Sequence, residues 1–315
     1  WGPPLAVAAA LLAACGLALW GYQHHRQTQA EAQARAQAEA RLLAQGTAAR
    51  ELCFSGGHAV ALGQLSELSR RAVPALARLD EMLEECAMFW LRDMRATAGK
   101  FSFAEQVAQA QPVLLAGLAV ATGKRAADLR AHLGWGEYLR SREGAQGLDP
   151  VSHWKRALDD EADNVYAQAM WARWLLDRRG GLAEARERFA KALGRGTHTL
   201  FVRGLQLGGT VTGNEDEQAY ALTVLDSMRR NREILLEVHR DRLWRHIFSQ
   251  RFLDDAYRER VAAALPPGDL LLSFQWAFPP ATVPEDRRLA WRFALAALQA
   301  RAGEPAAARA GLAAL

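Results

Sequence analysis

The chain lacks strand patterns, a rich supply of cysteine and the short motifs that mark common catalytic sites. Its 315 residues include three cysteines, too few for a disulfide framework, and no Cys/His cluster has the spacing of zinc ligands. No segment of useful length alternates apolar and polar residues, so we predict no sheet. Gly-x-Ser-x-Gly, paired catalytic carboxylates and a Cys/His nucleophile pattern are all missing. We therefore predict a protein that is not an enzyme and has no catalytic residue, cofactor or metal site.

Charge of one sign is also missing from the chain as a whole. Lys and Arg number 39 against 35 Asp and Glu, so the formal net charge is only +4. The most basic segment, 229–251, carries acidic residues between its arginines at distances that suit ion pairs on a helix. We interpret this segment as a solvated, ion-paired face and predict no nucleic-acid partner. The alternative is that some of its arginines grip an acidic partner peptide.

The first segment contains no charged residue and is typical of a membrane anchor. An apolar run extends from Leu5 to Trp20, and the first charge is Arg26. About 20 residues at 1.5 Å each match the roughly 30 Å hydrocarbon core of a bilayer. We therefore predict a transmembrane helix over 1–22 that has the lipid bilayer as its partner. Its anchoring residues are Leu5, Leu11, Leu12, Leu17, Leu19 and Trp20.

Two other fates of this segment stay open, as does the side of the membrane. Leu12-Ala13-Ala14-Cys15-Gly16 resembles a lipobox with Cys15 as the acylated residue, and a cleavable signal peptide is the second alternative. Ala and Arg are commoner than Ile and Lys, which is typical of GC-rich bacterial genomes. We expect a single-pass protein of the bacterial inner membrane. Its body is predicted in the periplasm, because a short flank before a single span commonly stays cytoplasmic; the cytoplasmic face is the alternative.

The remaining chain divides into helical segments. Residues 23–54 are rich in strong helix formers and predict a solvated spacer helix, with an Ala-seamed oligomeric stalk as the alternative. Ser55-Gly56-Gly57 ends that helix. Residues 58–127 predict degenerate helical hairpins, and Cys53 and Cys86 flank one of them. These two cysteines either pair in a disulfide or act as two small buried apolar residues.

A repeat with a spacing of about 35 residues lies within 128–198. In each half, an aromatic and a small residue on a first helix precede an aromatic and a small residue on a second. The pattern resembles the tetratricopeptide repeat, a helix–turn–helix of about 34 residues, although Gln168 departs from the large residue expected there. The residues that carry the resemblance are Trp135, Gly136, Leu139, Trp154, Ala157, Trp171, Ala172, Leu175, Ala185, Phe189 and Ala192.

The resemblance implies an all-α fold in which an α-solenoid of helical hairpins follows the anchor and the spacer. Residues 199–315 are expected to add further hairpins and to end in a repeat-like pair, where Leu298 precedes Gly303 and Pro305. Within this part we interpret Gly204 to Gly213 as an interruption between two helical blocks. Leu270 to Phe278 is very apolar and predicts buried packing, with an exposed docking element as the alternative.

Solenoids of this kind present an extended surface that binds other proteins or peptides. The resemblance therefore implies a membrane-anchored scaffold or adaptor that recruits or assembles partner proteins at the bacterial inner membrane. The alternatives are a structural subunit of a large membrane machine and a non-catalytic subunit of an envelope enzyme complex. Either would make the chain part of a homo-oligomer or a multi-subunit complex.

Overall fold

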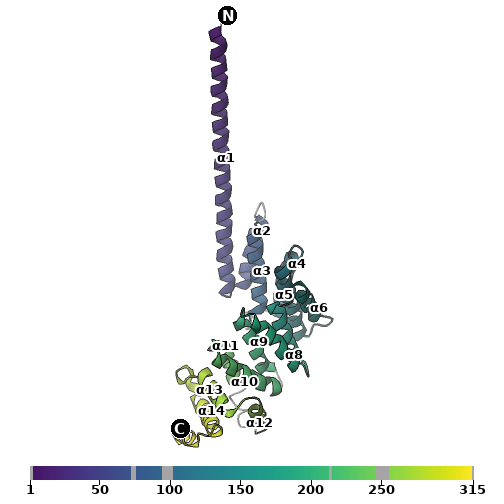
Figure 1. Cartoon of the computed structure of the whole chain (residues 1–315), viewed down its shortest axis with the longest axis vertical. Helices are drawn as coiled ribbons and strands as arrows, with labels where there is room; N and C mark the ends of the chain where they lie inside the picture. The colour runs from purple at the N-terminus through teal and green to yellow at the C-terminus, as the bar shows by residue number, and fades with distance from the viewer. Residues whose placement is uncertain (1–2, 72–75, 94–101, 213–214, 246–254, 314–315) are drawn as a thin grey trace. The chain divides into compact units, whose positions relative to one another are not determined.

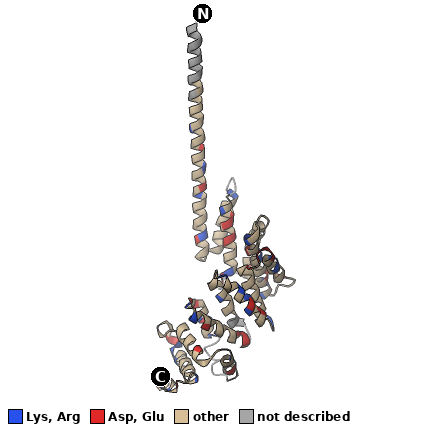
Figure 2. Ribbon diagram, in the orientation of Figure 1, with Lys and Arg blue, Asp and Glu red and all other residues tan. Residues whose placement is uncertain are grey.

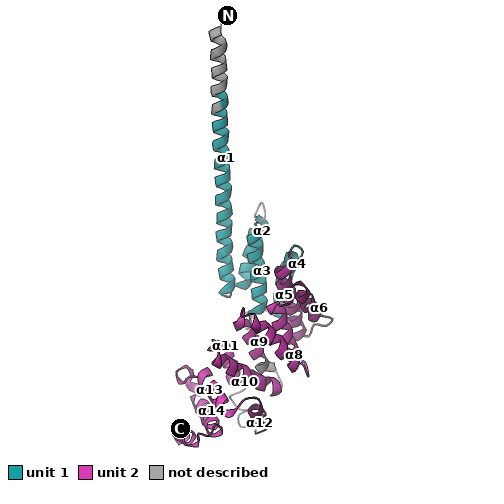
Figure 3. Cartoon of the chain, viewed as in Figure 1, with its two compact units in different colours: residues 1–120 teal, residues 121–315 magenta. Residues whose placement is uncertain are grey.

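The protein is all-α over the residues that its structure describes. The computed structural model describes residues 3–71, 76–93, 102–212, 215–245 and 255–313, with side chains from Gly16 onward except at 18, 209–212, 215, 255 and 258. Within those ranges every regular element is a helix, which confirms the predicted fold class at this level (Figure 1). The chain forms two compact units, residues 1–120 and 121–315, and the boundary falls inside the predicted segment 58–127 (Figure 3).

The described residues of unit 1 form four helices. A long helix packs its C-terminal part on the next two, and the third helix contacts the fourth. The fourth helix begins with a capping box, in which Ser102 and Glu105 each bond the other's backbone N–H. Ser55 to Gly57 separates the first two helices, as predicted. The elements are α1 (Pro3–Phe54), α2 (His58–Arg71), α3 (Ala77–Arg92) and α4 (Phe103–Leu118).

The described side chains of α1 are exposed from Gly16 to Arg41, and burial begins near the C-terminal end of the helix. All side chains described between Gly16 and Arg41 are exposed, whereas Ala49 and Cys53 are buried. At Gly46 the helix lies so close to α3 that a Cβ would fall 3.2 Å from the sulfur of Met82. The last turns of the predicted spacer therefore belong to the core of unit 1, because α2 and α3 cannot bury their apolar faces without them.

The predicted inner-membrane location is wrong. In the described part of the chain, no helix combines the length and the apolar composition that a bilayer crossing needs. Past Tyr22, α1 continues with Gln, Arg and Glu side chains that a hydrocarbon core does not accommodate. The anchoring residues Leu17, Leu19 and Trp20 are exposed; the side chains of Leu5, Leu11, Leu12 and Cys15 lie outside the described residues.

Unit 2 contains the remaining helices, which pack mainly on their neighbours in the chain. Within it, α5 pairs with α6, α7 with α8 and α9 with α10, while α5, α7, α9 and α11 contact one another in sequence. Its elements are α5 (Gly123–Arg142), α6 (Pro150–Asp160), α7 (Val165–Leu176), α8 (Leu182–Gly194), α9 (Thr199–Thr212), α10 (Glu215–Arg230), α11 (Glu237–Leu243), α12 (Asp255–Ala264), α13 (Pro267–Ala277), η3 (Pro280–Thr282), η4 (Glu285–Arg287), α14 (Arg288–Arg301) and α15 (Pro305–Ala313).

The residues singled out as repeat-packing positions are buried in this arrangement. Gln168, which stands where the repeat pattern has a large residue, is also buried, and Arg188 donates a hydrogen bond to its side-chain oxygen at 3.1 Å. The buried set is Trp135, Gly136, Leu139, Trp154, Ala157, Trp171, Ala172, Leu175, Ala185, Phe189 and Ala192.

In the C-terminal part, the prediction for one segment is wrong and the prediction for another is largely met. The interruption predicted over Gly204 to Gly213 is wrong as far as residue 212, because α9 runs through it; Gly213 lies outside the described residues. The apolar segment Leu270 to Phe278 lies in α13 up to Ala277 and ends at its C-cap; Leu270, Phe274 and Phe278 are buried, although Leu272 is half exposed. The last two helices, α14 and α15, pair with each other.

Helices α5 and α6 approach each other closely at Gly134, which the sequence did not single out. A Cβ there would lie 2.9 Å from both the carbonyl oxygen of Pro150 and Nε1 of Trp154. The same indole nitrogen donates a hydrogen bond to the carbonyl oxygen of Ala131 at 3.1 Å. Gly134 thus holds α5 against α6 and lets a fully buried tryptophan keep its hydrogen bond.

We predict that Gly134→Ala lowers the free energy of unfolding by about 2–3 kcal/mol, because the added methyl displaces backbone and indole together. Chemical denaturation followed by circular dichroism measures the change. The matched control is Gly194→Ala at the end of α8, where a Cβ meets no atom within 4 Å. That variant should keep or slightly raise stability, since alanine is the better helix former. Equal effects of the two substitutions would contradict the assignment.

Candidate functional site: an arginine face and a buried disulfide

A chain of polar contacts crosses from α5 to α7 in unit 2. The Tyr138 hydroxyl on α5 donates to Asp177, which follows α7, and Arg173 on α7 pairs with the same carboxylate at 2.8 Å. The guanidinium of Arg142 lies 5.9 Å from the ring centroid of Tyr138. Burial is the main cause that raises the pKa of Tyr138, so this hydroxyl stays a donor at neutral pH. These contacts fix the two arginines on the same side of α5 and α7.

Two glycines one turn apart on α9 make room for side chains from the helices on either side. A Cβ at Gly208 would lie 3.3 Å from Nε of Arg173 on α7. A Cβ at Gly204 would lie 3.2 Å from Nε2 of His239 on α11. Any larger residue at these positions would push Arg173 or His239 away. Gly204 and Gly208 therefore do not interrupt a helix; they let α7 and α11 pack closely against α9.

Four arginines act on one another through their charges, and we call them the arginine face: Arg142 on α5, Arg173 on α7, Arg242 on α11 and Arg245 just after α11. Burial lowers the pKa of Arg242, and the positive charges of the other three lower it further. Like charges in a partly buried place repel one another more strongly than they would in water. Arg173 is paired with Asp177, whereas Arg142 and Arg245 are the exposed members of the face.

The other charges of the predicted basic segment are mostly paired, but not all of them are solvated. Arg203 on α9 forms two bonds to the Glu233 carboxylate, at 2.6 and 2.9 Å, and both side chains are largely buried. Arg229 and Arg230 both pair with Asp226, whose side chain is 1% exposed. Within the predicted segment, Arg229, Arg230 and Glu233 are ion-paired, but the side chain of Glu233 is only 16% exposed, so the segment is not solvated throughout. Figure 2 shows the two signs interleaved along the ribbon.

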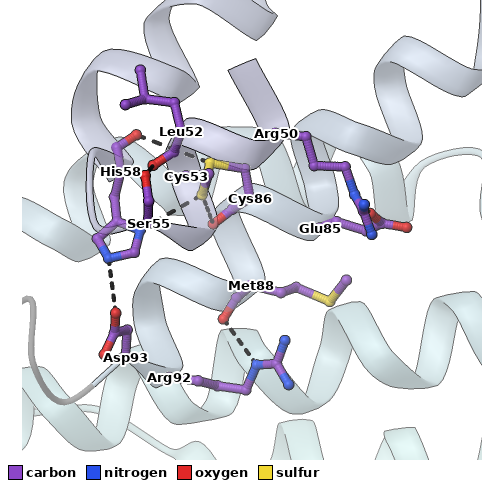
Figure 4. The surroundings of a disulfide bond; sticks show 10 residues. All are labelled: Arg50, Leu52, Cys53, Ser55, His58, Glu85, Cys86, Met88, Arg92 and Asp93. Atoms are coloured by element: carbon purple, nitrogen blue, oxygen red, sulfur yellow. Dashed lines mark hydrogen bonds and ion pairs between the residues drawn. A yellow bond between two sulfur atoms is a disulfide. The ribbon is translucent and has the colours of Figure 1, made fainter. Parts of the chain in front are cut away.

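Unit 1 holds a second cluster around a disulfide that joins Cys53 of α1 to Cys86 of α3 (Figure 4). Nδ1 of His58 lies 3.6 Å from the sulfur of Cys53, and Nε2 of His58 lies 3.1 Å from the carboxylate of Asp93. All four residues are buried, and the imidazole lies against the rings of Phe89 and Trp90. Inside the core, the His58 ring therefore contacts the disulfide on one side and a carboxylate on the other.

Sequence reasoning missed His58 and Asp93. The signal was present, because a histidine five residues after a cysteine faces back toward it when a tight turn and a new helix intervene. Asp93 has no such local signal, since only the packing of α3 against α2 brings it to His58.

The described residues contain no group of His, Cys, Asp and Glu that could hold a metal ion. Of the two histidines seven residues apart, His239 is buried, and His246 lies outside the described residues.

We predict that the free energy of unfolding falls as pH drops from about 6.5 to about 4, because of His239 on α11. Burial, aided by the charge of Arg242, lowers the pKa of His239 to about 4. The unfolded chain, with an ordinary pKa of about 6.5, binds the proton first, so the stabilisation present above pH 6.5 disappears on acidification. The contribution is on the order of 3 kcal/mol.

Denaturant titrations across this pH range measure the loss. His239→Gln keeps a neutral polar side chain and removes the titration, so its profile should be flatter than that of the wild-type chain over the same interval. Parallel profiles for the two chains would contradict the assignment of the slope to His239.

Comparison with known proteins adds no relative to these observations. The scan of family models, the search of curated proteins and the search of solved structures each gave no match to the chain.

Proposed function

We propose that the chain is a scaffold or adaptor whose unit 2 is a solenoid of tetratricopeptide type and binds partner proteins without catalysing a reaction. The support is the order of helix contacts. Each helix of the row α5, α7, α9 and α11 touches the next, while α6, α8 and α10 each pair with the helix before them. A row of parallel first helices of this kind offers one continuous surface to a partner chain.

The surface that we propose for binding is the arginine face, and the partner segment is acidic. Its position across three helices is the observation that carries the proposal, because one extended peptide could contact all of them. Guanidinium groups bind carboxylates with two parallel hydrogen bonds, which gives an acidic peptide both affinity and orientation. Arg142 and Arg245 are exposed at this face, and Arg242 is partly exposed, so three of the four are accessible.

The test is fluorescence anisotropy of labelled peptides with the full chain. A short glutamate peptide should bind, binding should weaken as salt is added, and a glutamine peptide of the same length should bind far less. The double variant Arg142→Gln, Arg245→Gln should weaken the glutamate peptide by about tenfold or more, the effect of roughly 1.4 kcal/mol.

A matched control separates the face from net charge. Arg156→Gln, Arg179→Gln removes the same two charges from exposed positions on α6 and after α7. It should keep the wild-type affinity. Equal losses in the two double variants would reduce the interaction to general electrostatics and would reject the arginine face as the binding surface.

A second candidate function is a fixed subunit of a larger assembly. It is favoured by Leu289 and Phe293, which lie one turn apart on α14 and are 59% and 54% exposed. An apolar stripe of this kind at the last helical pair suits a permanent contact. Affinity purification with mass spectrometry separates the two functions. A fixed subunit brings down a few stoichiometric partners that Phe293→Glu releases, whereas an adaptor brings down substoichiometric partners that the Arg142→Gln, Arg245→Gln variant releases.

A further inference from the structure

The disulfide of unit 1 is placed so that one of its sulfurs can become a stabilised thiolate. His58 is the first residue of α2, and its ring lies between the sulfur of Cys53 and the carboxylate of Asp93 (Figure 4). The ring can take a proton on the nitrogen that faces the sulfur, because the Asp93 carboxylate beside the other ring nitrogen stabilises the resulting imidazolium. The N-terminus of α2 adds partial positive charge at the same place.

We propose that Cys53 and Cys86 form a redox-responsive dithiol–disulfide pair in which His58, oriented by Asp93, stabilises Cys53 as a thiolate after reduction. His58 and Asp93 are positioning residues in this proposal. The chemical partner is a dithiol, such as a reduced small-molecule dithiol or the paired cysteines of a thiol–disulfide exchange protein.

The exchange balances without any further reagent. A thiolate of the dithiol attacks the sulfur of Cys86, the Cys53–Cys86 bond breaks, and Cys53 leaves as the thiolate that His58 holds. The second sulfur of the dithiol then attacks its own mixed disulfide and releases Cys86. The dithiol is oxidised to its disulfide, and its two protons end on the sulfur of Cys86 and on the ring of His58. Attack at Cys86 is favoured, because a sulfur whose thiolate is stabilised is the better leaving group.

Burial decides how the pair is reached. Both sulfurs are fully buried, so exchange requires a local opening of the packing around them. An exposed turn follows Cys53 at Ser55 and Gly56, and Gly56 adopts a φ of +107°, a conformation that favours glycine. The pair therefore responds to sustained reducing conditions and loses the covalent link between α1 and α3 when it does.

Other charged side chains of α1 and α3 have contacts of their own near this cluster. Arg50 on α1 is paired with Glu85 on α3. Arg92 on α3 lies over the ring of Phe89 and bonds the carbonyl oxygen of Met88. On α3, Glu84 is buried on the side of Gly117 in α4. His58 and Asp93 are therefore the groups that the pH test addresses.

The test uses the full chain in a Cys15→Ser, Cys86→Ser background, which leaves Cys53 as the remaining thiol. The ultraviolet absorbance of the thiolate is titrated against pH. We expect a midpoint at least about one pH unit below the ordinary value of about 8.5 for a cysteine. Adding His58→Gln should raise the midpoint by about one unit or more, and adding Asp93→Asn should raise it by less.

Circular dichroism of each variant shows whether unit 1 still folds. A midpoint at or above the ordinary cysteine value in the background chain overturns the proposal even if the His58 variant does not fold. A low midpoint that His58→Gln leaves unchanged in a folded chain overturns the role of His58. Neither outcome bears on peptide binding by the arginine face, so the two proposals fail separately.

Discussion

The structure of unit 2 depends on how closely its helices can approach one another. A helical hairpin cannot bury its apolar face alone, so each one needs its neighbour within van der Waals distance. Gly134 supplies that approach between α5 and α6, and the indole of Trp154 fills the space beside it while keeping its hydrogen bond. Gly204 and Gly208 do the same for α9. A single methyl group at Gly134 would separate two helices.

Close approach also brings charges into the interior, where their pairing is decisive. Arg203 and Glu233 are buried together and bonded twice, so neither charge is left without a partner in a low-dielectric place. In the arginine face several positive charges share one region, where burial and the neighbouring arginines lower the pKa of Arg242 and Asp177 pairs with Arg173. The same electrostatic rule stabilises the buried pair and underlies the proposal that the face binds an acidic segment.

In unit 1, a disulfide joins the end of α1 to α3. The described side chains of α1 are exposed from Gly16 to Arg41, and its last turns pack against α2 and α3. Cys53 and Cys86 join those turns to α3, and a disulfide of this separation restricts the unfolded chain. Burying the polar side chains of His58 and Asp93 beside it costs desolvation free energy that an apolar core would avoid. Its position next to a sulfur is what suggests chemistry beyond stabilisation.

The sequence by itself determined the helices and the buried residues between them, because apolar periodicity and small–aromatic spacing are local signals. Trp154 and Phe189 could be assigned to the core in this way. The location of α1 was not determined by its apolar start, and Gly204 and Gly208 were mistaken for a break. Only the tertiary structure decided the sites, since Asp93 meets His58, and Tyr138 meets Asp177, through helix packing. Contacts between residues far apart in sequence depend on the packing of whole helices, which a local pattern does not encode.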